Sequence, residues 1–253
     1  MTAPFDGRVA LITGAGRGIG RAVALHLAEG GARVALLARS VDQLEETAAT
    51  LRGEGGVALV LPADLADHDA VAGAAATAAK ALGPVDILVN NAAVVQPAGP
   101  TVSTPPAGWS SAFAVNVEAP IRLTLALLPA MMDRGWGRIV NVSSGIVDHP
   151  GAMVGLNAYA ATKAALEAHT LNLAAEVAGR GVTVNVYRPG SVDTAMQAWF
   201  RAQPSAEIGA DLHQHFQASY EQGALISPER SARALVTRLG GEGTGEIWNA
   251  TDA

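Results

Sequence analysis

RVALITGAGRGIG, residues 8–20, is the stretch of the chain that decides its fold. Its first six residues form a largely apolar run, typical of a buried strand, and Gly14, Gly18 and Gly20 follow at once. Glycines at these positions allow a tight turn and a close approach of the backbone to a ligand. A helix from 18 to 30 would then present free N–H groups and its positive dipole end to an anion such as a pyrophosphate. The stretch therefore predicts a strand, an anion-binding turn and a helix.

The glycine spacing distinguishes this turn from two common phosphate-binding patterns. It is Gly-x-x-x-Gly-x-Gly, and Ile19 stands where Gly-x-Gly-x-x-Gly would need its last glycine. No Lys followed by Ser or Thr completes the loop of NTP-hydrolysing proteins. A tight strand–helix connection without a ligand is the alternative interpretation. The setting between a strand and a helix favours cofactor binding.

Strand-like and helix-like segments alternate along the rest of the chain. Strands are predicted at 8–13, 33–38, 57–62, 86–90, 138–143, 182–188 and 245–249, and helices at 18–30, 40–53, 67–82, 106–134, 157–179 and 228–240. Continuous apolar strands separated by helices imply right-handed crossovers. We expect an α/β fold, a doubly wound parallel sheet of about seven strands with helices on both faces (Rossmann-type), in a single domain over 1–253.

Two helix starts carry capping signals. Ser227 precedes Pro228 and Glu229, and Asp67 precedes the third helix. Residues 195–226 do not fit the alternation and carry Trp199 and Phe216 among polar residues. We interpret this segment as a lid over a substrate site; the alternative is a helical excursion packed on the core.

Composition excludes several classes of function. The 253 residues carry a formal net charge of −6, with no run of Lys or Arg, so nucleic-acid or anionic-membrane binding has no electrostatic basis. Cysteine is absent, which excludes disulfides and thiolate chemistry. The start, MTAPFDGR, has no signal-peptide core, and the Ala-rich stretch 70–82 is too polar-flanked to span a bilayer. We expect a cytoplasmic protein without a metal, and interpret Asp211, His213 and His215 as a polar face of the lid.

Tyr159 and Lys163 fall four residues apart in a predicted helix, so they share one face. A positive charge about 4 Å from a phenol, at an effective dielectric near 20, is worth roughly 4 kcal/mol or about 3 pKa units. That would bring the phenol pKa near neutral pH and make Tyr159 a usable acid–base. Taken alone, a half-buried Tyr and a solvated Lys would explain the pair equally well.

Ser144 supplies a third group. The fifth predicted strand ends in Asn141-Val-Ser143-Ser144, and side chains at such strand ends line the ligand crevice of a doubly wound sheet. A serine there can donate a hydrogen bond to a developing oxyanion. A turn or capping serine is the alternative.

Several motifs together resemble the short-chain dehydrogenase/reductase family, in its single-domain members of about 250 residues. They are TGAGRGIG at 13–20, Asp64-Leu65, NNAA at 90–93, Asn116, VSS at 142–144, YAATK at 159–163 and Arg188-Pro189-Gly190. Their order and spacing match the family from about residue 7 to 249.

The resemblance implies a role for each matching residue. Tyr159 would be the general acid–base, Lys163 would lower its pKa and hold the nicotinamide ribose, and Ser144 would polarise the substrate oxygen. Asn116 would position a relay water. The implied cofactor-binding residues are Gly14, Arg17, Gly18, Ile19, Gly20, Arg39, Ser40, Asp64, Leu65, Asn91, Tyr159, Lys163, Pro189, Gly190, Val192 and Thr194.

One departure from the family concerns the substrate mouth. The interval from Ser144 to Tyr159 is two residues longer than the commonest family spacing. We expect the extra length to reshape the mouth around Met153 and Leu156. With Val94, Val95 and Trp199, these residues form the predicted substrate pocket.

The stretch VALLARS, residues 34–40, bears on the cofactor. Ala38 stands where NAD-preferring relatives place an Asp, and Arg39 follows it. Arg39 can pair with a 2′-phosphate through its planar fork, and Arg17 can approach the same group. We expect NADP(H) to be favoured, with NAD(H) possible; two solvated arginines are the alternative.

The predicted function is NADP(H)-dependent, reversible reduction of a ketone to a secondary alcohol. A 3-oxoacyl thioester reductase, an NAD-dependent alcohol dehydrogenase and a non-catalytic dinucleotide-binding sensor are the alternatives. A serine hydrolase would need Gly-x-Ser-x-Gly and a placed His, which the sequence lacks. The Ala-rich faces of 106–134 and 157–179 resemble the family's subunit contacts, which implies a homotetramer or homodimer.

Overall fold

A parallel sheet forms the centre of the computed structural model, which describes residues 3–252. The strand order is β3-β2-β1-β4-β5-β6-β7, so the chain moves outward from β1 in one direction and then outward from β4 in the other. The strands are β1 (Val9–Thr13), β2 (Arg33–Ala38), β3 (Ala58–Pro62), β4 (Ile87–Asn90), β5 (Gly137–Val142), β6 (Val182–Arg188) and β7 (Ile247–Asn249). The predicted seven-stranded, doubly wound α/β fold is confirmed. The reversal between β1 and β4 leaves a crevice at their carboxyl ends.

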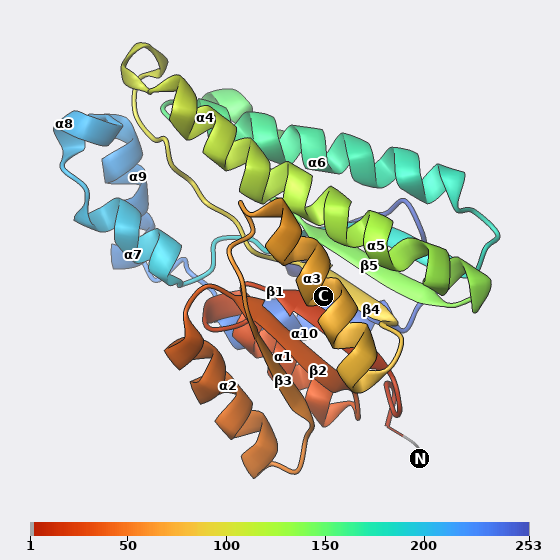
Figure 1. The fold of residues 1–253 in the computed structure, drawn as a ribbon. Helices are drawn as coiled ribbons and strands as arrows, with labels where there is room; N and C mark the ends of the chain where they lie inside the picture. The colour runs from red at the N-terminus through yellow and green to blue at the C-terminus, as the bar shows by residue number, and fades with distance from the viewer. Residues whose placement is uncertain (1–2, 253) are drawn as a thin grey trace.

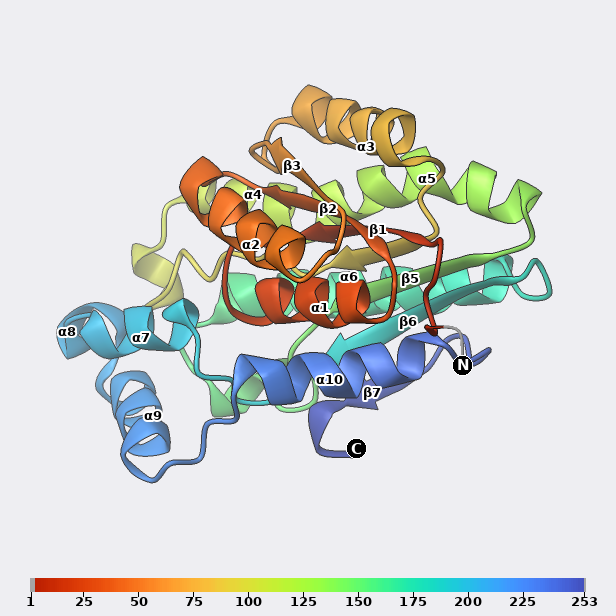
Figure 2. The ribbon, with the colours of Figure 1, turned by 90° about the horizontal axis from the view of Figure 1, so that it is seen from below.

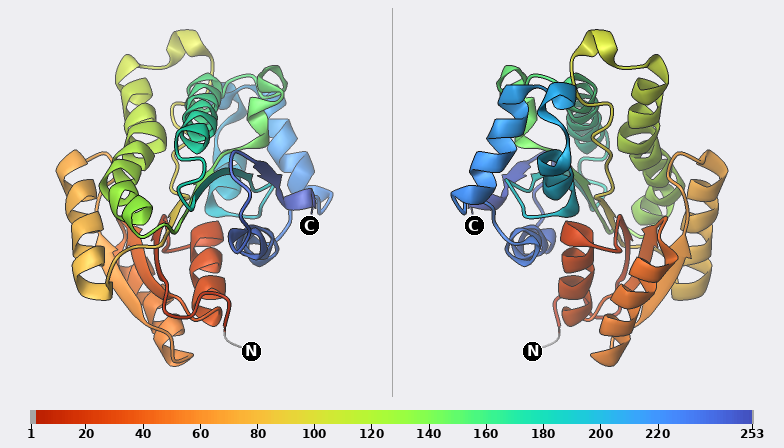
Figure 3. Two further views of the ribbon diagram at one scale, coloured as in Figure 1. Left: turned by 90° about the vertical axis from the view of Figure 1, so that its right-hand side faces the viewer. Right: turned by 90° about the vertical axis from the view of Figure 1, so that its left-hand side faces the viewer.

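Helices cover both faces of the sheet (Figure 1, Figure 2). One face packs against α1 (Gly18–Glu29), α2 (Val41–Gly53) and α10 (Pro228–Leu239). The other packs against α3 (His68–Leu82), α5 (Ala119–Asp133) and α6 (Asn157–Glu176). Side views show α3 and α5 on the opposite side of the sheet from α1 and α10 (Figure 3). Each face therefore has its own apolar core, as expected for strands that are apolar on both sides.

The two capping signals are confirmed. The Asp67 carboxylate accepts hydrogen bonds from the backbone N–H groups of Asp69 and Ala70 at the start of α3. The Ser227 hydroxyl accepts one from Arg230 N at the start of α10. These contacts satisfy N–H groups that have no partner within the helix.

The predicted helix over 106–134 is not continuous. It consists of α4 (Pro106–Phe113), a π-helical turn η2 (Ala114–Glu118) and α5. The π-turn inserts an extra residue into the helix, and such turns occur often at functional sites. Here it buries the side chain of Asn116.

The segment Pro106–Asp133 has the length and hydropathy of a membrane span. In the fold, its part α5 lies beside α3 and buries Leu123, Leu127 and Met131 against the sheet. A helix in the core of a globular protein passes the same test of length and composition. The segment therefore gives no membrane assignment.

The segment predicted as a lid leaves the sheet after β6 and forms α7 (Ala195–Ala202), α8 (Ser205–Ile208) and α9 (Ala210–Glu221). Its two ends are held together by a parallel bridge between Val192 and Ile226. Phe200 and Phe216 stack with ring centres 4.1 Å apart inside an apolar cluster of their own. The segment is thus a compact helical unit at one end of the sheet (Figure 1).

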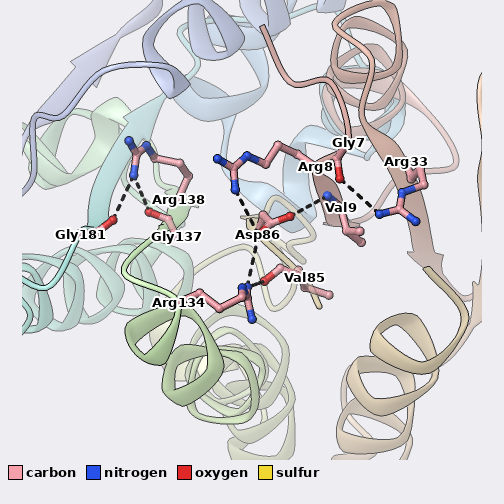
Figure 4. A network of polar contacts seen from close by, with 10 residues as sticks. All are labelled: Gly7, Arg8, Val9, Arg33, Val85, Asp86, Arg134, Gly137, Arg138 and Gly181. Carbon is pink, nitrogen blue, oxygen red and sulfur yellow. Dashed lines mark hydrogen bonds and ion pairs between the residues drawn. The ribbon is translucent and has the colours of Figure 1, made fainter. Parts of the chain in front are cut away.

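The amino ends of the strands are joined by a separate polar network (Figure 4). The Asp86 carboxylate accepts a hydrogen bond of 3.0 Å from Val9 N and pairs with Arg8 and Arg134 at 3.6 and 3.3 Å. The guanidinium groups of Arg8 and Arg138 lie over the Trp136 ring, 3.7 and 4.4 Å from its centre. This network ties β1, β4 and β5 together at the end of the sheet remote from the crevice.

Candidate active site

A cavity of about 720 Å³ lies at the carboxyl ends of the strands. It extends from the turn after β1 to the loop after β6, as expected where strand order reverses. Sixteen residues predicted for the site line it: Gly14, Arg17, Gly18, Ile19, Arg39, Ser40, Asp64, Leu65, Asn91, Val94, Val95, Tyr159, Lys163, Pro189, Thr194 and Trp199. Motifs far apart in the chain therefore meet around one space.

The glycine turn forms one end of the cavity. Gly14 and Gly18 have φ of +65° and +55°, a backbone conformation that side chains other than glycine's disfavour. Gly20 sits behind the turn, where an added Cβ would lie 2.3 Å from the Gly14 carbonyl oxygen. Arg17, Gly18 and Ile19 line the cavity, so the N-terminus of α1 faces it.

Hydrogen bonds between Asn91, which follows β4, and Thr13, the last residue of β1, hold the glycine turn in place. The Asn91 side chain donates to the Thr13 carbonyl at 2.9 Å, and its backbone N–H donates to the Thr13 hydroxyl at 2.9 Å. A little deeper, Asn90 donates to Asn141 at 2.8 Å and Asn141 donates to Thr170 at 2.8 Å. The NNAA stretch thus holds β1, β4, β5 and α6 in register below the cavity.

Two arginines stand at the far end of the cavity. Arg17 and Arg39 are exposed, and neither has an ion-pair partner within residues 3–252. The Asp64 carboxylate accepts from Ala66 N at 3.0 Å, which fixes the loop after β3. Gln43, which the sequence analysis missed, lies beside Arg39 and Ser40 in the wall.

Tyr159 and Lys163 lie on one face of α6, with Lys163 Nζ 5.7 Å from the centre of the Tyr159 ring. The ammonium donates a 2.7 Å hydrogen bond to the Val142 carbonyl oxygen. Burial lowers the pKa of Lys163 to about 8, an effect that the nearby Glu167 carboxylate opposes.

Burial raises the pKa of Tyr159 to about 12, although its hydrogen bond with Ser144 acts to lower it. The expectation of a phenol pKa lowered by Lys163 is therefore wrong for this geometry. Loss of solvent around the buried phenol outweighs the ammonium, which is itself buried and directed at a carbonyl oxygen.

Ser144 does not line the cavity but contacts Tyr159 through its side-chain hydrogen bond. It caps the short helical turn η3 (Gly145–Val147), accepting from Ile146 N at 3.3 Å. Its neighbour Ser143 does line the cavity, and its buried hydroxyl has no hydrogen-bond partner within residues 3–252. Ser144 is the serine predicted to act; the structure places Ser143 in the cavity wall and Ser144 beside Tyr159.

Asn116 lies beneath the wall. Its side-chain oxygen accepts from Val94 N at 2.9 Å, while its amide donates to Val94 O at 2.8 Å and to the Thr162 hydroxyl at 3.1 Å. The side chain thus fixes the loop after β4 to α6. Its predicted role in holding a relay water stays a prediction.

Five further predicted residues also lie off the cavity wall. Leu156 is buried in the apolar cluster with Phe200 and Phe216, and Met153 packs on that cluster. These two therefore support the wall instead of forming the predicted pocket surface. Gly20, Gly190 and Val192 shape the backbone behind the wall. The wall residues that the sequence analysis missed flank the predicted ones: Gly16, Ala38, Gln43, Ala63, Ala92, Ala93, Gln96, Val115, Val142, Ser143, Ala195 and Met196.

Comparison with known proteins identifies the family of this chain. Residues 8–205 match the family described as short chain dehydrogenase. The chain belongs to the short-chain dehydrogenase family. A short chain dehydrogenase of Pseudocercospora fijiensis is 39% identical over 196 residues, which cover 77% of this chain and 62% of that longer protein.

Two reductases match over nearly the whole chain. The 3-oxoacyl-acyl-carrier-protein reductase of Pseudomonas aeruginosa is 37% identical over 251 residues, covering 98% of this chain and 95% of that protein. The crystal structure of L-sorbose reductase from Gluconobacter frateurii, complexed with NADPH and L-sorbose, superposes with a TM-score of 0.87 and 29% identity. It covers 98% of this chain and 97% of that one.

Proposed function

We propose that this chain is an NADP(H)-dependent oxidoreductase that interconverts a ketone and a secondary alcohol. The observation that carries the proposal is that Tyr159 and Lys163 line the same cavity as the glycine turn, with Ser144 hydrogen-bonded to Tyr159 behind the wall. A phenol, a hydroxyl and an ammonium are the groups needed to bind a carbonyl oxygen and exchange a proton with it.

The residues of the cavity fit a nicotinamide dinucleotide phosphate. An added Cβ at Gly20 would collide with the Gly14 carbonyl behind the turn, so the turn needs this glycine to keep its shape, and the N-terminus of α1 suits a pyrophosphate. Arg17 and Arg39 offer cationic groups for a 2′-phosphate, and Asp64 and Leu65 would flank an adenine. Pro189 and Thr194 would contact the nicotinamide end. The cofactor, when bound, would supply or accept the hydride.

Tyr159 is the proposed proton donor in the reductive direction. With its pKa raised to about 12, the phenol is protonated at neutral pH and holds a proton ready for a carbonyl oxygen. The Ser144 hydroxyl would donate a hydrogen bond to the same oxygen, and the Lys163 ammonium would stabilise the phenolate left behind.

The substrate we propose is an uncharged, moderately apolar ketone. Val94, Val95, Met196 and Trp199 line the cavity near Tyr159, and Lys163 is the one charged group described there. Apart from Lys163, no cationic side chain among the described residues lines the cavity beside Tyr159 to bind a substrate carboxylate. A 3-oxoacyl thioester remains the second substrate candidate, because the Pseudomonas aeruginosa relative is a reductase of that class.

Kinetics can test the proposal directly. A panel of carbonyl compounds should be run with NADPH and with NADH, using the wild-type chain and Tyr159→Phe. Turnover of a ketone with NADPH, lost in Tyr159→Phe while NADPH still binds, is the expected result. NADPH binding without turnover of any compound would favour the sensor alternative, and full activity in Tyr159→Phe would overturn the mechanism.

The proposed enzyme would act in the cytoplasm as a homotetramer or homodimer. Leu125 on α5 and Leu171 on α6 are exposed, which supports a subunit contact over these two helices. Size-exclusion chromatography with light scattering would test the assembly.

A further inference from the structure

Arg188, the last residue of β6, is buried and holds two carboxylates at once. Its Nε and Nη2 donate to the two oxygens of Glu167 at 2.9 and 2.8 Å, a bidentate pair. Its Nη1 donates to the Asp148 carboxylate at 2.5 Å. One guanidinium therefore joins three segments that are far apart in the sequence.

Each of these segments carries part of the proposed site. Asp148 ends the short turn η3, which begins directly after Ser144. Glu167 lies one helical turn beyond Lys163 on α6, and Arg188 precedes Pro189 in the cavity wall. The guanidinium thus sets the distance between the Ser144 segment and the helix that carries Tyr159.

Arg188 thus has two arms, the ion pair with Glu167 and the ion pair with Asp148, and the two differ in burial. The Glu167 side chain is only 7% exposed, whereas that of Asp148 is 54% exposed. Removing either member of the buried arm would leave an uncompensated charge inside the protein and disturb folding. An exposed carboxylate such as Asp148 contributes little to stability, so the Asp148 arm can be removed without unfolding the chain.

The ion pair between Asp148 and Arg188 anchors the segment between Ser144 and α6 near its start. This segment consists of two short helical turns, Gly145–Val147 and Pro150–Ala152, and includes the two residues by which the interval exceeds the common family spacing. Within residues 145–156, Asp148 makes the one side-chain polar contact that the structure records. Apolar packing of Ile146, Val147, Met153 and Leu156 and a hydrogen bond of 2.8 Å from Gly99 N to Gly155 O also hold the segment. The Asp148 ion pair is its directional side-chain contact, and it lies close to Ser144 along the chain.

We propose that Asp148 is a positioning residue: through Arg188 it holds the Ser144 hydroxyl at hydrogen-bonding distance from Tyr159 and hence from the substrate oxygen. This inference rests on the proposed function, because it acts through Ser144. Asp148 itself does not line the cavity.

A double-mutant cycle tests the inference with steady-state kinetics at saturating NADPH. Asp148→Asn should lower kcat at least tenfold, with the ketone KM changed less than twofold, and leave the Kd for NADPH and the thermal midpoint unchanged. In a Ser144→Ala background, Asp148→Asn should cause no further loss, because the group it positions is gone. Asp133→Asn, an exposed aspartate at the end of α5, is the matched control and should behave as wild type.

The outcomes separate this inference from the proposed function. An unchanged kcat in Asp148→Asn, or an equal fractional loss with and without Ser144, would overturn the positioning role while leaving the function intact. If Ser144→Ala and Tyr159→Phe also keep full activity, the proposed function itself fails.

Discussion

Lys163 Nζ lies 5.7 Å from the centre of the Tyr159 ring, one turn further along α6, and both side chains are buried. Burial moves their pKa values in opposite directions, Tyr159 up to about 12 and Lys163 down to about 8. In each case the neutral form is favoured, because leaving water penalises the charged form. A charged Lys163 at neutral pH is therefore kept in the site at a cost to stability.

Replacing Lys163 with Met should stabilise the protein at pH 7 while abolishing turnover. A pKa lowered from 10.5 to about 8 corresponds to a penalty of about 3 kcal/mol. Loss of the hydrogen bond to the Val142 carbonyl offsets about 1 kcal/mol of that gain. We expect the free energy of unfolding, measured with urea at pH 7, to rise by about 2 kcal/mol.

The sign of the pH dependence gives a second check on the same variant. Between pH 8 and 10.5 the unfolded chain binds a proton at Lys163 that the folded chain has released, so wild-type stability rises with pH there. The advantage of Lys163→Met should shrink between pH 7 and pH 10. Lys80→Met, at an exposed position on α3, should show neither effect. A destabilised Lys163→Met at pH 7 would contradict the prediction.

The two directions of the reaction should depend differently on pH. Alcohol oxidation needs the Tyr159 phenolate, whose fraction rises with pH up to a pKa of about 12, so kcat for oxidation should climb from pH 7 to 10. Reduction needs the neutral phenol and should change little over that range. Ser144→Ala removes the hydrogen bond that lowers the Tyr159 pKa, and should move the oxidation profile to higher pH. An oxidation rate independent of pH would argue against Tyr159 as the base.

The fold followed from local patterns in the sequence. The central strands β1, β4, β5 and β6 are short, largely apolar runs buried on both faces, and caps such as Asp67 act through neighbouring backbone groups. The break at η2 could not be predicted in this way, because Asn116 makes its contacts with Val94 and Thr162, 22 and 46 residues away. Helical periodicity carries no information about such distant partners.

In the site, too, the sequence predicts features that depend on neighbouring residues and does not predict those that depend on distant ones. The spacing of Tyr159 and Lys163 predicts that they lie on one face of a helix. It gives no information about burial, and burial determines the direction in which the Tyr159 pKa shifts. Met153 and Leu156 lie close in sequence to Tyr159, but both pack in the apolar cluster that contains Phe200, behind the wall of the cavity. Gln43 was not predicted because it reaches the cavity from the first turn of α2, whereas the predicted cofactor contacts Arg39 and Ser40 lie directly after β2.

Arg39→Asp should reverse the preference for the cofactor. Arg39 is exposed at the cavity end, so its pairing with a 2′-phosphate is screened by solvent and is worth about 1–2 kcal/mol. A new carboxylate would also repel that phosphate and accept hydrogen bonds from a ribose hydroxyl. We expect kcat/KM with NADPH to fall at least tenfold and kcat/KM with NADH to rise.

The control for Arg39→Asp is a second replacement of a basic residue by aspartate, at a position outside the cavity. Lys80→Asp lies on an exposed turn of α3 and should leave the NADPH to NADH ratio of kcat/KM unchanged. Equal use of the two cofactors by the wild-type chain would rule out the NADP(H) preference, whatever the variant does.

Asp86→Ala should weaken the fold without touching the site. The substitution leaves Val9 N without its acceptor and Arg8 and Arg134 without their counter-charge, at the end of the sheet remote from the cavity. Both arginines are about one-third exposed, so we discount the ion pairs and expect a loss of about 2 kcal/mol in the free energy of unfolding. Asp86→Asn keeps an acceptor for Val9 N and should cost about half as much.

Urea unfolding of the two variants, with kcat/KM measured at 25 °C on folded protein, separates stability from activity. Both variants should keep wild-type kcat/KM and NADPH affinity, because no residue of this network lines the cavity. Asp133→Ala, an exposed aspartate on α5, should change the free energy of unfolding by less than about 0.5 kcal/mol. Equal stability losses in Asp86→Ala and Asp133→Ala would show that the network does not hold the amino ends of β1 and β4 together.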